Sequence, residues 1–206
     1  IAIALLISLF WWCGIHGATI IGGIMGPLLQ SNGLANQELF NQGVQLVAGE
    51  NAAIVTNQFV DQYITFGGSG LTLGLVCTML YFAKSKQYKQ LGRLSIVPGL
   101  FNINEPIIFG TPIVMNPLML IPFLLSPAVA VTLAYFTMKM GLVAKLPGIA
   151  APWTSPAGIG AFIASGGKIS AGLLQFVIVL VQIVIWYPFF KIMDKQKYDE
   201  EQGIKG

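Results

Sequence analysis

Long apolar runs alternate with shorter polar segments along most of the chain. The four clearest runs cover residues 1–29, 63–83, 118–138 and 169–190. About 20 apolar residues are enough to cross the hydrocarbon core of a bilayer, so each run is a candidate membrane span. The pattern therefore predicts an all-α integral membrane protein that crosses the bilayer several times.

A fifth apolar run, residues 94–117, is broken by four prolines and two glycines. Glu105 lies in its middle, and no other acidic residue occurs between Asp61 and Asp194. A carboxylate at membrane depth is costly unless it has a partner. Glu105 is therefore the first candidate functional residue of the chain.

The composition agrees with a membrane protein and weakens other classes. Hydrophobic residues make up 55% of the chain and charged residues 9%, whereas soluble domains carry roughly 25% charged residues. The net charge of +3 does not indicate nucleic-acid binding, because the basic residues lie in short clusters at the ends of apolar runs. Residue 1 already lies inside an apolar run, so we expect the chain to be part of a longer protein.

The distribution of lysine and arginine predicts the topology. The densest basic clusters are residues 84–93 and 191–205, and both are expected in the cytoplasm. Between them, residues 118–138 and 169–190 supply two full crossings, so residues 94–117 are expected to form a re-entrant hairpin from the cytoplasmic side. Broken backbone at membrane depth is tolerated where it is buried in protein or lines a watery cavity.

A second re-entrant hairpin is expected from the outer side, over residues 40–68. Residues 30–62 contain no lysine or arginine, which places them outside, and Gly67-Gly68-Ser69-Gly70 would form the hairpin tip. Two hairpins of opposite orientation are typical of transporters with discontinuous helices around a central site. This scheme leaves three lysines outside, which is its weak point: Lys139, Lys145 and Lys168.

The residues beside Glu105 suggest a polar binding tip. Glu105 precedes Pro106, so its backbone is expected to be extended, and Pro106 suits the first position of a helix. The helix N-terminus would favour the ionised carboxylate, while burial would favour the protonated form. Asn102 and Asn104 add hydrogen-bonding groups. Glu105 would either contact a ligand or ion, or merely cap the short helix.

His16, the only histidine, lies inside an apolar run between Gly14 and Gly17. A single histidine on an apolar face is often a structural residue whose hydrogen bonds are satisfied within the protein. With Glu105 also at membrane depth, the two could instead form a hydrogen-bonding pair on a hydroxylated ligand.

Trp153 lies in a segment rich in proline and glycine, where its ring could stack on a sugar or lie at the membrane interface. Thr65, Gly68 and Ser69 could offer hydroxyl and backbone donors to a ligand, or form only a flexible turn. The other tryptophans are expected to pack or to lie in the interface belt: Trp11, Trp12 and Trp186.

Motifs of soluble and membrane-bound hydrolases and of nucleotide-binding enzymes are absent from the sequence. There is no HExxH, GxSxG or P-loop motif, and no His/Cys cluster suited to a metal. We therefore expect neither a metal nor a cofactor, and an intramembrane enzyme is poorly supported. Cys13 and Cys77 lie in apolar runs and are expected to be small buried residues.

The run NEPIIFGTPIVMNP at residues 104–117 resembles the enzyme IIC membrane component of the bacterial sugar phosphotransferase system, in its lactose/cellobiose/diacetylchitobiose branch. Further motifs of that family follow in matching order: WCGIHG around His16, GGSG at 67–70, APWTSP at 151–156 and YPFFK at 187–191. The resemblance covers essentially the whole chain, but only the C-terminal part of such a permease.

The resemblance implies a sugar-transport domain over residues 1–190, followed by a solvated cytoplasmic tail over residues 191–206. Glu105 and His16 match residues that hydrogen-bond sugar hydroxyls near the position to be phosphorylated. Trp153 and the region 65–70 match further sugar-contacting positions. The domain is expected to move as a rigid unit and to carry a disaccharide inward.

The resemblance also implies partners and a location. A cytoplasmic enzyme IIB would phosphorylate the sugar from a phosphocysteine, which neither Cys13 nor Cys77 can supply because both lie in apolar runs. Whether this chain counts as an enzyme is therefore open. The missing N-terminal half would form a homodimer in the bacterial inner (plasma) membrane, with the C-terminus of the chain in the cytoplasm. The alternative is an ion- or proton-coupled secondary transporter that uses His16 and Glu105 as a proton relay.

Overall fold

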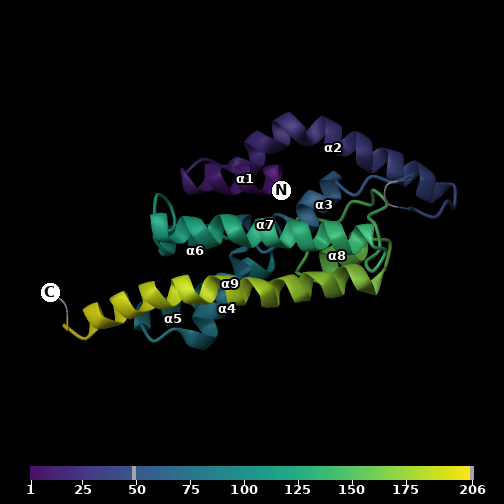
Figure 1. Cartoon of the computed structure of the whole chain (residues 1–206). Coiled ribbons are helices and arrows are strands. Elements are labelled where there is room, and N and C mark those ends of the chain that lie inside the picture. The colour runs from purple at the N-terminus through teal and green to yellow at the C-terminus, as the bar shows by residue number, and fades with distance from the viewer. Residues whose placement is uncertain (48–49, 205–206) are drawn as a thin grey trace.

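A computed structural model describes residues 1–47 and 50–204. Its helices lie roughly side by side along one long axis (Figure 1), and the described residues contain no β-strand. The all-α prediction is confirmed. The elements in chain order are α1 (Ala2–Trp12), α2 (Gly17–Asn41), α3 (Asn57–Tyr63), the 3₁₀ turn η1 (Ser69–Leu71), α4 (Leu73–Phe82), α5 (Lys86–Leu100), α6 (Glu105–Gly110), α7 (Pro117–Lys139), α8 (Ile159–Ala164) and α9 (Ile169–Glu201).

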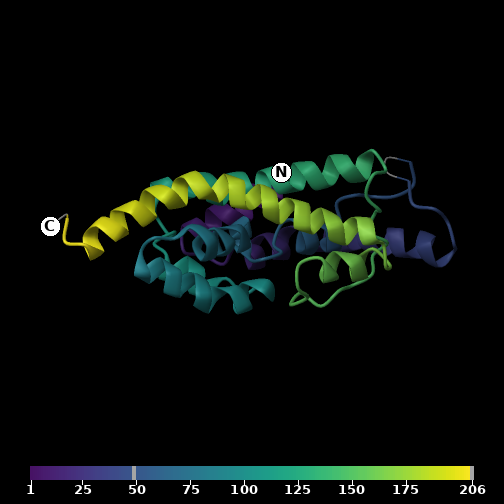
Figure 2. The ribbon, with the colours of Figure 1, turned by 90° about the horizontal axis from the view of Figure 1, so that it is seen from below.

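Two helices, α7 and α9, form the long axis of the molecule. They run antiparallel beside each other in both views (Figures 1 and 2). Among the described residues, they are the helices long and apolar enough to cross a membrane by length and composition. They contain the runs 118–138 and 169–190, where the sequence predicts spans.

The other two predicted spans are not continuous helices. The run 1–29 is divided between α1 and α2 by a short connection that holds Cys13 and His16. The run 63–83 is broken as well, because α3 ends at Tyr63 and α4 begins only at Leu73. The glycines of the GGSG motif explain the second break, since Gly67, Gly68 and Gly70 all have positive φ angles that a helix does not allow.

The buried role expected for the two cysteines is wrong for Cys13. Its position in the connection between α1 and α2 leaves it exposed, while Cys77 on α4 is half-buried. Both thiols are free.

Helices α5 and α6 pack against each other and are joined by a tight turn over residues 101–104. Helix α6 begins at Glu105, so the extended backbone expected for that residue is wrong. The reason is the Asn104 carbonyl, which accepts the N–H groups of both Ile107 and Ile108 and so closes the first helical turn around Glu105. Pro106 therefore occupies the second helical position rather than the first.

The segment after residue 190, predicted as a solvated tail, is helical; most of its side chains are exposed, but Met193 and Asp194 are buried. Helix α9 continues to Glu201 without interruption. Asp194 is only 4% exposed, and its carboxylate accepts the backbone N–H groups of Lys84 and Ser85 in the turn between α4 and α5. These bonds are formed between residues about 110 positions apart, which is why the local sequence does not reveal them.

Glu201 makes a second contact of the same kind. Three groups at the start of α5 donate to its carboxylate: the N–H groups of Lys86 and Gln87 and the hydroxyl of Ser85. These bonds, the one from Lys86 above all, hold the pKa of Glu201 at about 2, well below its ordinary value. The end of α9 thus fixes the beginning of α5.

The chain segments around residues 84 and 144 contact opposite ends of α9 and are therefore far apart along the helix axis. The Lys84 N–H is bound by Asp194, whereas the Ala144 N–H donates to the Ser170 hydroxyl near the start of α9. Ser170 and Asp194 are 24 residues apart on α9, which corresponds to about 36 Å at 1.5 Å per residue. This distance exceeds the roughly 30 Å thickness of a hydrocarbon core.

Candidate functional site

A cavity of about 710 Å³ lies where four connections of the chain meet. These are the link between α1 and α2, the segment around η1, the turn between α5 and α6, and the loop before α8. All eight residues proposed from the sequence line this cavity: His16, Thr65, Gly68, Ser69, Asn102, Asn104, Glu105 and Trp153. The fold thus brings together residues that lie up to 137 positions apart in the chain.

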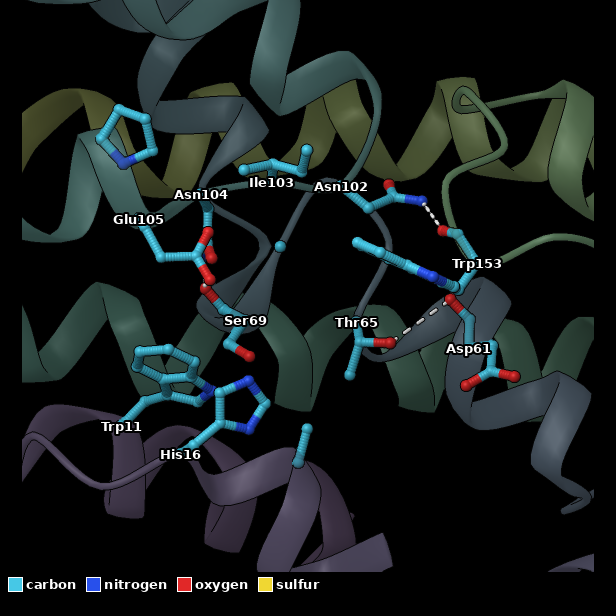
Figure 3. A pocket seen from close by; sticks show the side chains of 13 residues that line it. Trp11, His16, Asp61, Thr65, Ser69, Asn102, Ile103, Asn104, Glu105 and Trp153 are labelled. Atoms are coloured by element: carbon cyan, nitrogen blue, oxygen red, sulfur yellow. Dashed lines mark hydrogen bonds between the residues drawn. The ribbon is translucent and has the colours of Figure 1, made fainter.

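Glu105 and His16 lie on facing walls of the cavity, with Ser69 between them (Figure 3). Within the described part of the chain, no group donates a hydrogen bond to the Glu105 carboxylate. In particular, no backbone N–H of α6 does so, and the helix has no side-chain cap. The carboxylate therefore does not act as a cap and is available as an acceptor for a ligand.

His16 stands at the N-terminus of α2 and is held in a defined tautomer. Its Nδ1 accepts the backbone N–H of Thr19 at 3.3 Å and lies 2.8 Å from the Thr19 hydroxyl. In the neutral ring the proton must then be on Nε2, which becomes a hydrogen-bond donor. The ring also packs against Trp11, with 4.6 Å between the ring centroids. His16 therefore has a structural role in α2 and keeps one N–H for a ligand.

Asn102 acts as a clamp between three segments of the chain. Its backbone has a φ of 67°, in the left-handed region that Asn tolerates better than most residues. Its Oδ1 accepts the Gly67 N–H, and its Nδ2 donates to the carbonyls of Trp153 and Ser155. The side chain that the sequence suggests as a ligand contact is thus used within the protein, where it positions the cavity walls.

Asn104, in the same turn, bonds through its side chain to the η1 segment alone among the described residues. Its side chain is buried, and Nδ2 donates to the Ser69 carbonyl at 2.9 Å and the Thr72 hydroxyl at 3.0 Å. Gly68 lies directly against it, with a φ of 90°. A Cβ at position 68 would lie 2.3 Å from the Asn104 side chain, so this approach requires glycine.

Trp153 offers an open aromatic face to the cavity. Its side chain is among the more exposed of the large apolar residues, at 65%. Its backbone is nevertheless fixed, because its carbonyl accepts the bond from Asn102. Thr65 lies below it in Figure 3, and its hydroxyl donates weakly to the carbonyls of Val60 and Asp61 at the end of α3.

Two polar or aromatic residues of the cavity wall are missed by sequence reasoning. Asp61 lies on α3 one helical turn before Thr65, and both line the cavity. Thr65 lies two residues beyond the end of α3, so helical periodicity in the sequence does not reveal that the two residues meet. Trp11 is expected only to pack or to lie at the interface, but it is buried against His16 and also lines the cavity.

The arrangement suits a neutral ligand with many hydroxyl groups. The walls offer two carboxylates, an imidazole N–H, two hydroxyls and an open indole face. Carboxylates accept hydrogen bonds from hydroxyl groups, the imidazole N–H donates one, and an indole face can pack on an apolar ring face. The cavity also falls within the usual 300–1,000 Å³ range of small-molecule sites.

Comparison with known proteins identifies relatives over nearly the whole chain. A family model described as "Phosphotransferase system, EIIC" matches residues 1–127. The PTS system cellobiose-specific EIIC component of Geobacillus stearothermophilus is 52% identical over 203 residues, which are 98% of this chain and 44% of that protein. The PTS system lactose-specific EIICB component of Staphylococcus aureus is 38% identical over 200 residues, covering 96% of this chain and 34% of that one.

A solved structure agrees with these matches. The crystal structure of the transporter ChbC, the IIC component from the N,N'-diacetylchitobiose-specific phosphotransferase system, superposes with a TM-score of 0.93. It is 50% identical in sequence, and the match covers 98% of this chain and 46% of that one. The chain therefore spans less than half the length of each of these proteins.

Proposed function

The chain belongs to the phosphotransferase system EIIC family, and from this premise we propose that it is the sugar-binding and translocating part of a disaccharide permease. The observation that carries the proposal is the cavity in which Glu105, His16 and Trp153 meet from three separate segments. The substrate class is a disaccharide of the cellobiose, lactose or diacetylchitobiose type.

Each of the three residues has a distinct task in this proposal. Glu105 accepts hydrogen bonds from sugar hydroxyls, because its carboxylate has no donor among the described residues. His16 donates from Nε2, because Nδ1 is engaged by Thr19. Trp153 packs its exposed indole on a sugar ring face. Asn102 and Asn104 hold the walls in place rather than forming the main sugar contacts.

The phosphoryl group comes from outside this part of the permease. Cys13 and Cys77 do not line the cavity. We propose that a cytoplasmic enzyme IIB carries the phosphocysteine; the lactose-specific relative has EIICB in its name, which fits a physical association of the two components. Phosphorylation would trap the sugar by adding about −1.5 to −2 charges at neutral pH.

Two re-entrant hairpins supply the inner walls of the proposed transport domain, residues 1–190. We propose that α5 and α6 form a re-entrant hairpin from the cytoplasmic side, and that residues 40–68 form its counterpart from the outer side. The bonds of Asn102 and Asn104 to the η1 segment support movement of both tips as one rigid unit. The domain lies in the bacterial plasma membrane with its C-terminus in the cytoplasm, and the rest of the permease forms the homodimer.

Sugar binding without an ion gradient tests this function. The purified full-length permease is titrated with cellobiose, lactose and diacetylchitobiose in a calorimeter, with glucose as the monosaccharide control. At least one disaccharide should bind saturably and more tightly than glucose. Absence of binding by all three would remove the proposal.

A proton-coupled transporter is the second candidate, because His16, Glu105 and Asp61 line one cavity and could pass a proton. It is separated from the first by adding an uncoupler to cells that still make phosphoenolpyruvate. Uptake that collapses would favour the proton relay, whereas unchanged uptake would exclude it.

Substitution of His16 is expected to weaken disaccharide binding even when helix α2 is preserved. His16→Ser keeps a good N-cap for the Thr19 N–H but removes the Nε2 donor. We expect about 10-fold weaker disaccharide binding with an unchanged unfolding temperature, whereas His16→Ala should lose both affinity and about 1 kcal/mol of helix capping. Calorimetry and thermal unfolding measure the two effects. Normal affinity in His16→Ser would restrict the residue to capping.

Residues 84 and 145 are expected to lie on opposite sides of the membrane. Single cysteines replace Lys84 or Lys145 in a full-length protein whose native cysteines are changed to serine, and intact cells are treated with an impermeant thiol reagent. Position 145 should be labelled and position 84 protected until the cells are opened. Labelling of both positions in intact cells would contradict the two-hairpin topology.

A further inference from the structure

A second cavity, of about 480 Å³, lies outside the sugar site, beside the turn between α4 and α5 and the last third of α9. Figure 1 shows this end of α9 next to α4 and α5, at the end of the molecule that carries the C-terminus. Nothing in the proposed sugar transport uses it. Its lining combines lysines with aromatic side chains.

The charge of the cavity is positive. Lys84, Lys191 and Lys195 line it, together with Asp194 and Asp199. In the part of the chain that the structure describes, the one ion pair is Lys197–Glu200, so none of the three lysines has a carboxylate within 4.0 Å. The Asp194 carboxylate accepts hydrogen bonds from the backbone of the α4–α5 turn, and Asp199 is the other acidic residue among those that line the cavity.

Aromatic side chains line the same cavity as the lysines. Tyr81 and Phe82 at the end of α4 are 79% and 50% exposed. Phe82 packs edge-on against Tyr187 at 5.1 Å, and Lys191 Nζ lies 5.7 Å from the centre of the Tyr187 ring. Exposed aromatic rings beside basic residues are typical of the boundary between hydrocarbon and lipid headgroups.

An exposed apolar stripe on α9 leads directly into this cavity. Its residues follow one another at helical spacings of three and four: Leu173, Val177, Leu180 and Val184. The same spacing continues to Tyr187 and Lys191, so one face of α9 passes from apolar through aromatic to cationic groups. The exposures of Leu180 and Val184 are 64% and 73%, so no other part of the described chain covers them.

We propose that this cavity binds the headgroup of an anionic phospholipid. The lipid phosphate lies among Lys84, Lys191 and Lys195, and its acyl chains follow the apolar stripe of α9. The order of groups along α9 matches the order of groups in such a lipid, and the unpaired ammonium groups match its charge. Asp194 keeps the site in shape, because it fixes the backbone of Lys84.

Native mass spectrometry of the full-length permease tests the site. The delipidated protein is titrated with phosphatidylglycerol and with phosphatidylcholine of the same acyl chains. The test variant is Lys191→Gln/Lys195→Gln. The matched control is Lys86→Gln/Lys89→Gln, which removes the same number of charges from two exposed lysines at the start of α5 that do not line the cavity. Thermal unfolding confirms that both variants are folded.

We expect the unmodified protein and the control to bind phosphatidylglycerol at least 10-fold more tightly than phosphatidylcholine, and the test variant to lose most of this preference. Equal binding of both lipids, or an equal loss in both variants, would overturn the proposal. Displacement of the lipid by millimolar inorganic phosphate would assign the cavity to a free anion instead. If the test variant bound phosphatidylglycerol normally but supported slower phosphorylation of the sugar by enzyme IIB, the cavity would be assigned to the partner protein instead.

Discussion

Glu105→Gln is expected to weaken disaccharide binding by about 10- to 150-fold while the fold stays intact. Charge-assisted hydrogen bonds contribute roughly 1.5–3 kcal/mol, which corresponds to this range of affinities. The protein itself should not be destabilised, because no group of the described residues donates to the carboxylate. Calorimetric titration gives the affinity, and thermal unfolding gives the stability.

Glu38→Gln is the matched control for this substitution. Glu38 is an exposed carboxylate on α2 that does not line the cavity, so its loss changes the net charge equally without touching the site. It should bind disaccharide normally. Near-normal affinity in Glu105→Gln as well would mean that the sugar is not recognised through this carboxylate.

Asn102→Ala is expected to abolish measurable sugar binding and to destabilise the protein by about 4–5 kcal/mol. The amide makes three hydrogen bonds, each contributing roughly 1 kcal/mol. Alanine at a φ of 67° adds roughly 1–2 kcal/mol of backbone strain. Because the bonds join the η1 segment to the loop of Trp153, their loss should also separate two walls of the cavity.

Two further substitutions at this position distinguish the amide from the backbone. Asn102→Gly removes the bonds but not the tolerance of a positive φ, so it should be more stable than Asn102→Ala and still fail to bind. Asn102→Asp keeps the acceptor for the Gly67 N–H and loses the two donors. If Asn102→Gly bound sugar normally, the clamp would have no role in shaping the site.

The principal residues of the candidate site could be found from the sequence because of where they stand. A carboxylate or an imidazole inside an apolar run is costly, so Glu105 and His16 are conspicuous without any structure. The clamp formed by Asn102 was not visible in the same way. Its partners lie 35 to 53 residues away, and only the folded chain shows that its amide is already engaged.

The fold was predicted well where the apolar runs are uninterrupted and less well where they are not. The bounds of α7 and the start of α9 follow directly from their hydropathy. The break before α4 depends on positive φ angles at Gly67 and Gly68, which a count of apolar residues does not register. The extension of α9 beyond residue 190 depends on bonds from Asp194 and Glu201 to a turn more than 100 residues earlier.

The close approach of Gly68 to Asn104 has a consequence for attempts to redesign sugar preference. A side chain at position 68 would collide with Asn104, the residue before Glu105. A single substitution at this glycine would therefore disturb the wall that positions Glu105. Trp153 differs, because its indole is exposed and only its carbonyl is fixed. Libraries that aim at longer or branched sugars should therefore vary the Trp153 loop and leave the glycine tip unchanged.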